Sequence, residues 1–513
     1  MKFVMSANEK ELRAARQAER KEKKIAAAAE QEKNDRRYRS KVIIVVVVLV
    51  VLIIGALLIN SDVFYTKTTA LTVGTTKYTP AEVSYFYRST YNTLYQNLYS
   101  QLGTSISMLL DTSKPLSEQE YPYDYDTDEK RTWADVVIET AQDDIVRVTS
   151  FYDAAVKEGF ALTDEDRSTI DQTLANYRSY AASSGFSNVN KFYTAYFGKG
   201  VDEKLVSKLQ EKIVLATNYY NKVLEDLTYT DEELAAYYAE HADELDYYAY
   251  YVYPINSTMD IFSELEGDEL KTEVHNAAQE IVDAATDEDS FIEAVKAFAG
   301  ENTVVSIALN HADNIGANIK DWVLDETRQP GDTTVIDLDS LSYALMFIEH
   351  DRNDYNTVDF RHILVQVGTE EDGVYTEENK EAALSYAESL MEEWEMDPTE
   401  ENFSIMANNY SEDTGSQNNG GLYEQVTKYA MVHGVDHFLF HEGHVAEDCD
   451  LVYGESSSYI GYHLIYYVGE NRRNCDILAE NALRTEDFNA KAEELASAYT
   501  VVEGGGRRFI ADL

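Results

Sequence analysis

The segment DFRHILVQV at residues 359–367 decides how the fold is interpreted. It is short, mostly apolar and bounded by polar residues, which is typical of a β-strand. A second run of the same kind, GYHLIYYV, follows at 461–468. Between the two runs we expect an amphipathic helix followed by a Phe-containing turn, TEENFSIMANNYS at 399–411. Strands and helices therefore follow one another here in the order strand–helices–strand–strand.

The pattern around this segment occurs twice in the chain. Three pairs of segments correspond: 246–254 with 359–367, 321–336 with 437–452, and 342–347 with 461–466. We therefore predict two tandem domains, which we call the first repeat (242–352) and the second repeat (357–470). His362 and His463 of the second repeat are matched in this alignment by Ala249 and Ala344 of the first. The loss of both histidines from one copy is what an inactive duplicate would show.

Four motifs occur in a fixed order within the second repeat: FRHILVQV at 360–367, FSIMANNYSEDTGSQNNGGLYE at 403–424, Met431, and GYHLIYYV at 461–468. In this combination the second repeat resembles the parvulin-type peptidyl-prolyl isomerases. The larger portion 60–513 is similar to membrane-anchored or periplasmic foldases of the PrsA and SurA kind. The resemblance implies two FKBP-like α+β domains, the first of them degenerate, after a helical chaperone domain that the C-terminal helix completes.

The resemblance also implies the site. His362, Asp413 and His463 would be catalytic, while the proline ring would be held by Leu422, Met431, Val435 and Phe440. Val435 stands where the family usually has Phe, and Ile460 stands where Ser or Tyr is common. Rotation about an X-Pro bond breaks no covalent bond, so no cofactor or metal is expected.

The N-terminal region predicts a membrane anchor. Basic residues outnumber acidic ones over 1–41, and VIIVVVVLVVLIIGALLI at 42–59 contains no charge. As a helix this run would be about 27 Å long, close to the thickness of a bilayer core. A cleaved signal peptide is the alternative, but no small-residue cleavage site follows. The basic flank predicts a single-pass protein with residues 1–41 in the cytoplasm and 60–513 outside the cell membrane.

Residues 60–241 are predicted to form the helical domain, because capping boxes begin at Thr163 and Thr230 and apolar residues follow at helical spacing. Residues 471–513 are predicted to contain a C-terminal helix, near 473–499, that packs on this domain.

Composition excludes some classes of protein. The chain has 513 residues with 43 basic and 93 acidic side chains, a net charge of −50, which argues against nucleic acid as a partner. Its two cysteines, Cys449 and Cys475, exclude a disulfide scaffold, and whether they pair is left open.

Four histidines form a separate feature, His433, His437, His441 and His444. Their spacing would suit either one polar helix face or a zinc ion. The polar face is the favoured interpretation, because glycines interrupt the segment and no zincin motif is present.

Three functions fit these observations. The first is an isomerase and chaperone for unfolded secreted chains that contain X-Pro bonds. The second is a holdase chaperone, without isomerase activity, in which both repeats only bind clients. The third is a structural protein of the cell envelope. The oligomeric state is left open, with a homodimer among the options.

Overall fold

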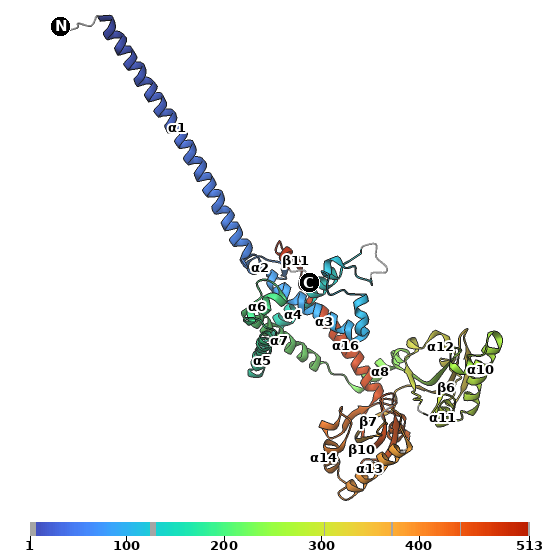
Figure 1. Cartoon of the computed structure of the whole chain (residues 1–513). Coiled ribbons are helices and arrows are strands. Elements are labelled where there is room, and N and C mark those ends of the chain that lie inside the picture. Colours follow the sequence, from blue (N-terminus) through green and yellow to red (C-terminus); the bar gives the residue numbers. More distant parts are fainter. Residues whose placement is uncertain (1–6, 124–129, 302, 371–372, 442, 511–513) are drawn as a thin grey trace. The chain divides into compact units, whose positions relative to one another are not determined.

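The computed structural model describes residues 7–123, 130–301, 303–370, 373–441 and 443–510. The chain divides into two compact units (Figure 1). Unit 1 contains Met1–Asp226 and Phe488–Leu513, and unit 2 contains Leu227–Asp487. The two units are described separately below.

Unit 1 is mainly helical. Its elements are α1 (Ala7–Asn60), α2 (Val63–Lys67), β1 (Leu71–Val73), β2 (Thr76–Tyr78), α3 (Pro80–Leu102), η1 (Gly103–Met108), η2 (Leu116–Glu118), α4 (Trp133–Lys157), α5 (Asp164–Ser183), α6 (Val189–Phe197) and α7 (Glu203–Asp226). One apolar core joins residues of α3, α4, α5, α6 and α7 and includes Trp133, Ile145 and Tyr193, each almost fully buried.

Side-chain caps set where several helices begin. Thr163 accepts a hydrogen bond from the backbone of Asp166, whose carboxylate bonds back to the Thr163 backbone, and α5 starts at the next residue. Thr230 and Glu233 do the same for α8 (Asp231–Glu240), in unit 2. Both predicted capping boxes are therefore confirmed. They satisfy N–H groups that the first helical turn leaves without partners.

The apolar run 42–59 lies within α1. Among the residues that the structure describes, no helix is long and apolar enough to cross a membrane. The side chains of residues 54–60, of which 54–59 belong to the predicted span, lie outside the described residues.

The C-terminal part of the chain completes the core of unit 1. Helix α16 (Asn474–Ser497) places the buried Phe488 against Phe151 and Tyr220, at ring-centroid distances of 6.0 and 4.4 Å. Tyr499 donates a hydrogen bond to Asp153. Strand β11 (Val501–Glu503) then pairs with β1 in a three-stranded sheet, and η6 (Arg507–Phe509) follows. The helix bounds agree closely with the predicted 473–499, whereas the exposed three-residue strand was not anticipated.

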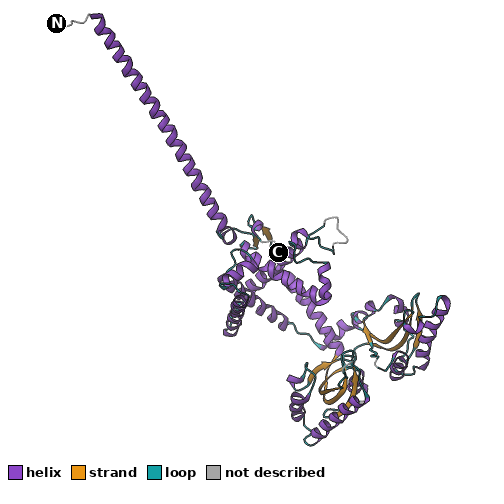
Figure 2. Cartoon of the chain, viewed as in Figure 1, coloured by secondary structure: helices purple, strands orange, loops and turns teal. Residues whose placement is uncertain are grey.

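Unit 2 contains two four-stranded antiparallel sheets, seen as separate groups of strands in Figure 2. The elements of the first repeat are α9 (Ala242–Leu245), β3 (Tyr247–Asn256), η3 (Asp260–Phe262), α10 (Gly267–Ala284), α11 (Glu288–Ala299), β4 (Ala308–Asn310), η4 (Ala312–Asn314), α12 (Ala317–Val323), β5 (Thr333–Asp337) and β6 (Leu341–Asp351). Those of the second repeat are β7 (Asn356–Gln366), α13 (Glu377–Glu395), α14 (Glu400–Tyr410), η5 (Gln417–Asn419), β8 (Leu422–Val426), α15 (His433–His441), β9 (Cys449–Glu455) and β10 (Ile460–Arg473).

The two sheets have equivalent strand orders, β4-β3-β6-β5 and β8-β7-β10-β9. Each sheet is covered on both faces, which explains why its central strands are nearly continuous apolar runs. In β10, Leu464 and Tyr466 pack towards α13 and α14, whereas Ile465 and Tyr467 pack towards α15. The fold thus places α15 over the same face of the sheet that carries His463.

The strand register corrects one part of the sequence alignment. His362 and His463 are diagonal neighbours, because His362 pairs with Ile465 and His463 pairs with Leu364. Ala344 pairs with Tyr253, so the position diagonal to it in β3 is Tyr251 rather than Ala249. The alignment of Ala249 with His362 is therefore displaced by two residues. Tyr251 is itself buried and stacks on Phe291, at 5.5 Å between centroids.

Candidate functional site

Two neighbouring strands bring the histidines of the second repeat together. His362 lies on β7 and His463 on β10, with 2% and 0% of their surfaces exposed. Their Nδ1 atoms are 3.3 Å apart and their rings stack at 5.4 Å between centroids. The predicted pair is therefore in contact. Buried apolar residues of the same strands, Phe360 and Ile363 in β7 and Leu464 and Ile465 in β10, fix the strands and leave the two rings little freedom.

Asp413 completes the group from the loop after α14. Its Oδ2 lies 3.0 Å from His362 Nε2 and accepts hydrogen bonds from Tyr423 Oη at 3.0 Å and from Ser416 Oγ at 2.5 Å. The backbone N–H groups of Gly415 and Ser416 each donate to this carboxylate at 3.1 Å. The hydrogen bond from His362, assisted by those from Ser416 and Gly415, holds the pKa of Asp413 well below its usual value although partial burial opposes the shift. Asp413 is therefore ionised at neutral pH.

This network determines the tautomers of the two histidines. His362 Nε2 donates to the Asp413 carboxylate, which can only accept. In the neutral form of the His362 ring, Nδ1 is then an acceptor. Nδ1 of His463 must then donate to it. Burial, together with the neighbouring His362, lowers the pKa of His463 to about 3, so this ring is neutral at physiological pH. Its Nε2 has no hydrogen-bond partner within the described part of the chain.

The NGG motif has a steric role beside His362. Gly421 has a φ of +72°, and its carbonyl accepts a hydrogen bond from the His362 backbone at 3.0 Å. A Cβ on Gly421 would lie 2.3 Å from the His362 carbonyl oxygen. Only glycine tolerates both the left-handed backbone and this approach, so the motif allows β8 to join the strand that carries His362.

The four predicted substrate-binding residues lie in different environments. Leu422 and Met431 are half-buried, at the start of β8 and just before α15. Val435 has no exposed surface, because it lies on the inner side of α15 and packs with Phe438 and Ile465. Phe440 lies partly buried in the same cluster, with its ring 5.7 Å from that of Tyr355. Leu422, Met431 and Phe440 therefore each present some surface to a ligand, whereas Val435 is fully enclosed.

Three of the four additional histidines share one face of α15, as the favoured interpretation predicted, and the fourth does not. His433, His437 and His441 lie on α15, with successive ring centroids 6.3 and 5.3 Å apart. His444 lies beyond the helix and stacks on Phe438. No cluster of three or more His, Cys, Asp or Glu side chains suited to a metal ion occurs among the described residues.

The two cysteines are separate free thiols. Cys449 on β9 lies beside Met391, with 3.8 Å between their sulfur atoms, while Cys475 lies in the first turn of α16.

Two polar residues of the site were not identified from the sequence, Ser416 and Tyr423. Each donates to Asp413, and the Tyr423 ring packs edge-on against His362 at 5.4 Å. Tyr423 stands next to Leu422 in the strand that follows NGG, so side-chain alternation in that strand was the available signal.

Comparison with known proteins agrees with this geometry. Residues 343–471 match the PPIC-type PPIASE domain. This part of the chain, with its paired histidines and the adjoining Asp413, is a peptidyl-prolyl isomerase domain of the parvulin class. No curated protein sequence matches the chain significantly.

The similar solved structures are foldases of the PrsA and SurA kind. PrsA from Bacillus subtilis is 12% identical, with a TM-score of 0.26 over 72% of this chain and 88% of that chain. The foldase PrsA from Streptococcus pneumoniae is 9% identical, with a TM-score of 0.23 over 70% and 81% of the respective chains. The match to the SurA-like chaperones PEB4 and Cj1289 of Campylobacter jejuni has 14% identity and a TM-score of 0.15, and covers 69% of this chain and 93% of the other.

Proposed function

We propose that this protein is an extracytoplasmic peptidyl-prolyl cis–trans isomerase and chaperone that assists the folding of secreted proteins. Its clients would be unfolded or partly folded chains that contain X-Pro bonds. The observation that carries the proposal is the hydrogen-bonded series Asp413, His362 and His463 within a PPIC-type domain.

The chemistry needs no nucleophile. Rotation about a peptide bond has a barrier of about 18–20 kcal/mol, because resonance gives the C–N bond partial double-bond character. The same resonance places partial negative charge on the carbonyl oxygen. An ionised carboxylate beside that oxygen destabilises the planar amide more than the twisted one, in which conjugation is lost. The carboxylate therefore lowers the barrier by acting differently on the ground state and the transition state.

Asp413 is suited to this role because it is ionised and its side chain is 19% exposed. His362, Tyr423 and Ser416 hold the carboxylate in one orientation. His463 is a positioning residue, because it fixes the tautomer and the ring of His362 from behind. Leu422 and Met431 would hold the proline ring.

The decisive experiment measures isomerisation of a proline-containing peptide by the full chain in a protease-free assay. We expect acceleration over the uncatalysed rate, with a loss on the order of 10²–10³-fold for Asp413→Ala, which removes the charge beside the carbonyl. His463→Ala should reduce the rate less, because it acts through His362. His275→Ala, which removes an exposed histidine of the first repeat, is the matched control and should have no effect. If the folded protein does not accelerate the reaction, the proposed isomerase activity is refuted.

A holdase without isomerase activity is the second candidate, and one observation favours it. The two histidines are almost fully buried, and the cavity of about 500 Å³ beside Met431 is lined by neither of them. A holdase would suppress aggregation of a denatured client equally well with and without Asp413→Ala. An isomerase would lose its acceleration of proline-limited refolding in that variant.

The proposed location is the cell membrane, with 42–59 as a single transmembrane helix and the N-terminus in the cytoplasm. The support is the uncharged run and its basic flank. Protease added outside intact cells should then digest residues 60–513 and spare a tag placed before residue 42. Protection of the C-terminal portion would exclude this topology.

A further inference from the structure

The segment between β8 and α15 carries Met431, and residues of the first repeat contact it on both sides of Met431. On one side, Glu349 of β6 accepts a hydrogen bond from Tyr429 Oη at 2.7 Å. Its two carboxylate oxygens also lie 3.0 and 3.3 Å from Lys428 Nζ. On the other side, His433 Nε2 lies 3.1 Å from Asp289 of α11. The first repeat therefore holds this segment at two places.

The backbone of the segment needs such support. Tyr429 has a φ of +63°, in the left-handed region that costs a bulky L-residue about 1–2 kcal/mol. Its N–H donates to the buried carboxyl group of Asp436, one turn into α15, and its hydroxyl is held by Glu349. A strained conformation persists only where surrounding contacts determine it. Glu349 is one of the contacts that determine this one.

The Glu349–Lys428 pair is shielded from water. The two side chains are only 28% and 19% exposed, and Lys428 Nζ also lies 4.8 Å from the centre of the Tyr355 ring. The Lys428 backbone N–H donates to the Tyr355 hydroxyl at 3.1 Å. Charge-assisted hydrogen bonds are stronger in such a setting than at an exposed surface. The pair can therefore fix the path of the chain three residues before Met431.

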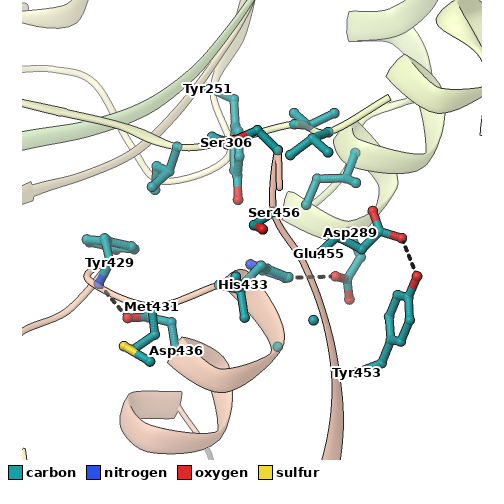
Figure 3. A pocket seen from close by; sticks show the side chains of 18 of the residues that line it. Tyr251, Asp289, Ser306, Tyr429, Met431, His433, Asp436, Tyr453, Glu455 and Ser456 are labelled. Carbon is teal, nitrogen blue, oxygen red and sulfur yellow. Dashed lines mark hydrogen bonds and ion pairs between the residues drawn. The ribbon is translucent and has the colours of Figure 1, made fainter. Parts of the chain in front are cut away.

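Met431 is one of the residues that line a cavity of about 500 Å³, whose opposite wall belongs to the first repeat (Figure 3). Tyr251, Ile292 and Val305 line that wall, whereas Met431 and Val432 line the side of the second repeat. A displacement of the segment would therefore change both the position of Met431 and the width of this cavity.

We propose that Glu349 is a positioning residue of the isomerase site: from the first repeat, which has no histidine pair, it holds residues 428–433 so that Met431 can bind the proline ring of the substrate. This inference rests on the proposed isomerase function. It gives the first repeat a role in catalysis by the second that needs no chemistry of its own. Because Glu349 acts through a binding residue, its loss should weaken substrate binding more than it slows the bound substrate.

The test compares variants of the full chain in peptide isomerisation. Glu349→Ala should lower kcat/KM on the order of tenfold, mainly by raising KM, since a small displacement of a positioning group has this size of effect. Glu349→Gln should recover most of the activity, because its amide oxygen still accepts from the Tyr429 hydroxyl. Tyr429→Phe removes only that hydroxyl and should change KM in the same direction by a smaller factor.

The matched control is Asp337→Asn. Asp337 is a carboxylate of the same sheet that bonds to Ser342 and His275 within the first repeat and to no residue of the segment. This variant should keep the wild-type kcat and KM. An equal loss in Asp337→Asn and Glu349→Ala would show that only the stability of the first repeat matters, and would overturn the proposal.

A second readout does not depend on activity. In protein labelled at the methionine methyl groups, the NMR signal that disappears in Met431→Leu identifies Met431. That signal should shift in Glu349→Ala and stay near its wild-type position in Glu349→Gln and Asp337→Asn. An unchanged Met431 signal in folded Glu349→Ala would refute the positioning role. If the wild-type chain does not isomerise peptides, the proposed function fails, and the methyl signal still decides whether Glu349 positions the segment.

Discussion

At the scale of single residues, the site depends on the protonation states of His463 and Asp413. His463 is held neutral by burial, with a pKa lowered to about 3, and Asp413 is held ionised by its hydrogen-bond donors. The charge at the site therefore resides on one partly exposed carboxylate, while the histidines behind it orient it. Neither histidine could be replaced by a larger or charged side chain without disturbing both central strands.

The buried His463 predicts a pH-dependent stability. An unfolded histidine has a pKa of about 6.5, so between about pH 3 and 6.5 the unfolded state binds more protons than the folded state. The stabilisation is complete above this window and decreases as the pH falls through it. From about pH 7 to about pH 5, the free energy of unfolding of the wild type should fall by about 2 kcal/mol relative to His463→Asn.

Urea unfolding of both proteins at the two pH values provides the measurement. The comparison must be a difference, because burial raises the pKa of Asp436 to about 7 and gives a contribution of opposite sign. That contribution is the same in both proteins and cancels. A wild-type-minus-variant difference that is independent of pH would contradict the neutral, buried state of His463.

At the scale of elements, short helices and loops position the site while the sheets supply the frame. Helix α15 lies close to β9 because Gly434 has no side chain there, since a Cβ would be 2.1 Å from the Tyr453 carbonyl oxygen. Backbone N–H groups of the loop after α14 hold the Asp413 carboxylate. Strand β8 can approach β7 because Gly421 has no side chain that would meet the His362 backbone. These three contacts thus depend on a glycine or on a hydrogen-bonded loop, whereas the contact between His362 and His463 comes from the register of β7 and β10.

The docking of α16 in unit 1 gives a prediction for one element. Phe488 is 7% exposed and lies against Phe151 and Tyr220. Phe488→Ala should destabilise unit 1 by about 3–5 kcal/mol, because it removes a buried aromatic ring and leaves a cavity. Asn489→Ala, at an exposed position one residue further on, should change stability little. Thermal unfolding together with limited proteolysis around β11 provides the measurement, and equal effects of the two substitutions would contradict this packing.

At the scale of the whole molecule, the charge is the dominant property. A net charge of −50 makes the folded chain repel itself, and surface ion pairs offset only part of this. Salt should therefore stabilise the protein. Raising NaCl from about 20 mM to about 200 mM should raise Tm by roughly 2–4 °C, the change expected from about 1 kcal/mol of screened repulsion.

Choline chloride at the same ionic strength distinguishes screening from specific binding. Screening depends on ionic strength alone, so both salts should give the same increase. An increase with NaCl only would indicate a sodium site instead, and no change with either salt would show that the repulsion is already balanced in the folded state.

The sequence by itself determined the local structure and the candidate residues of the site. The capping boxes at Thr163 and Thr230 fixed helix starts, because a cap needs only residues within one turn. The motifs around His362, Asp413 and His463 also identified the parvulin class, since each motif is contiguous and the order of motifs was sufficient.

Only the tertiary structure decided what depends on distant contacts. The register of β3 and β6 moved the counterpart of His362 to Tyr251, because a ladder with a bulge is set by packing across the whole sheet. Val435 became a core residue, and Ser416 and Tyr423 became partners of Asp413, through the way in which loops close over the sheet. The contact of Glu349 with Lys428 and Tyr429 joins residues about 80 positions apart. No local pattern encodes such a contact, since it exists only when two separately folded repeats meet.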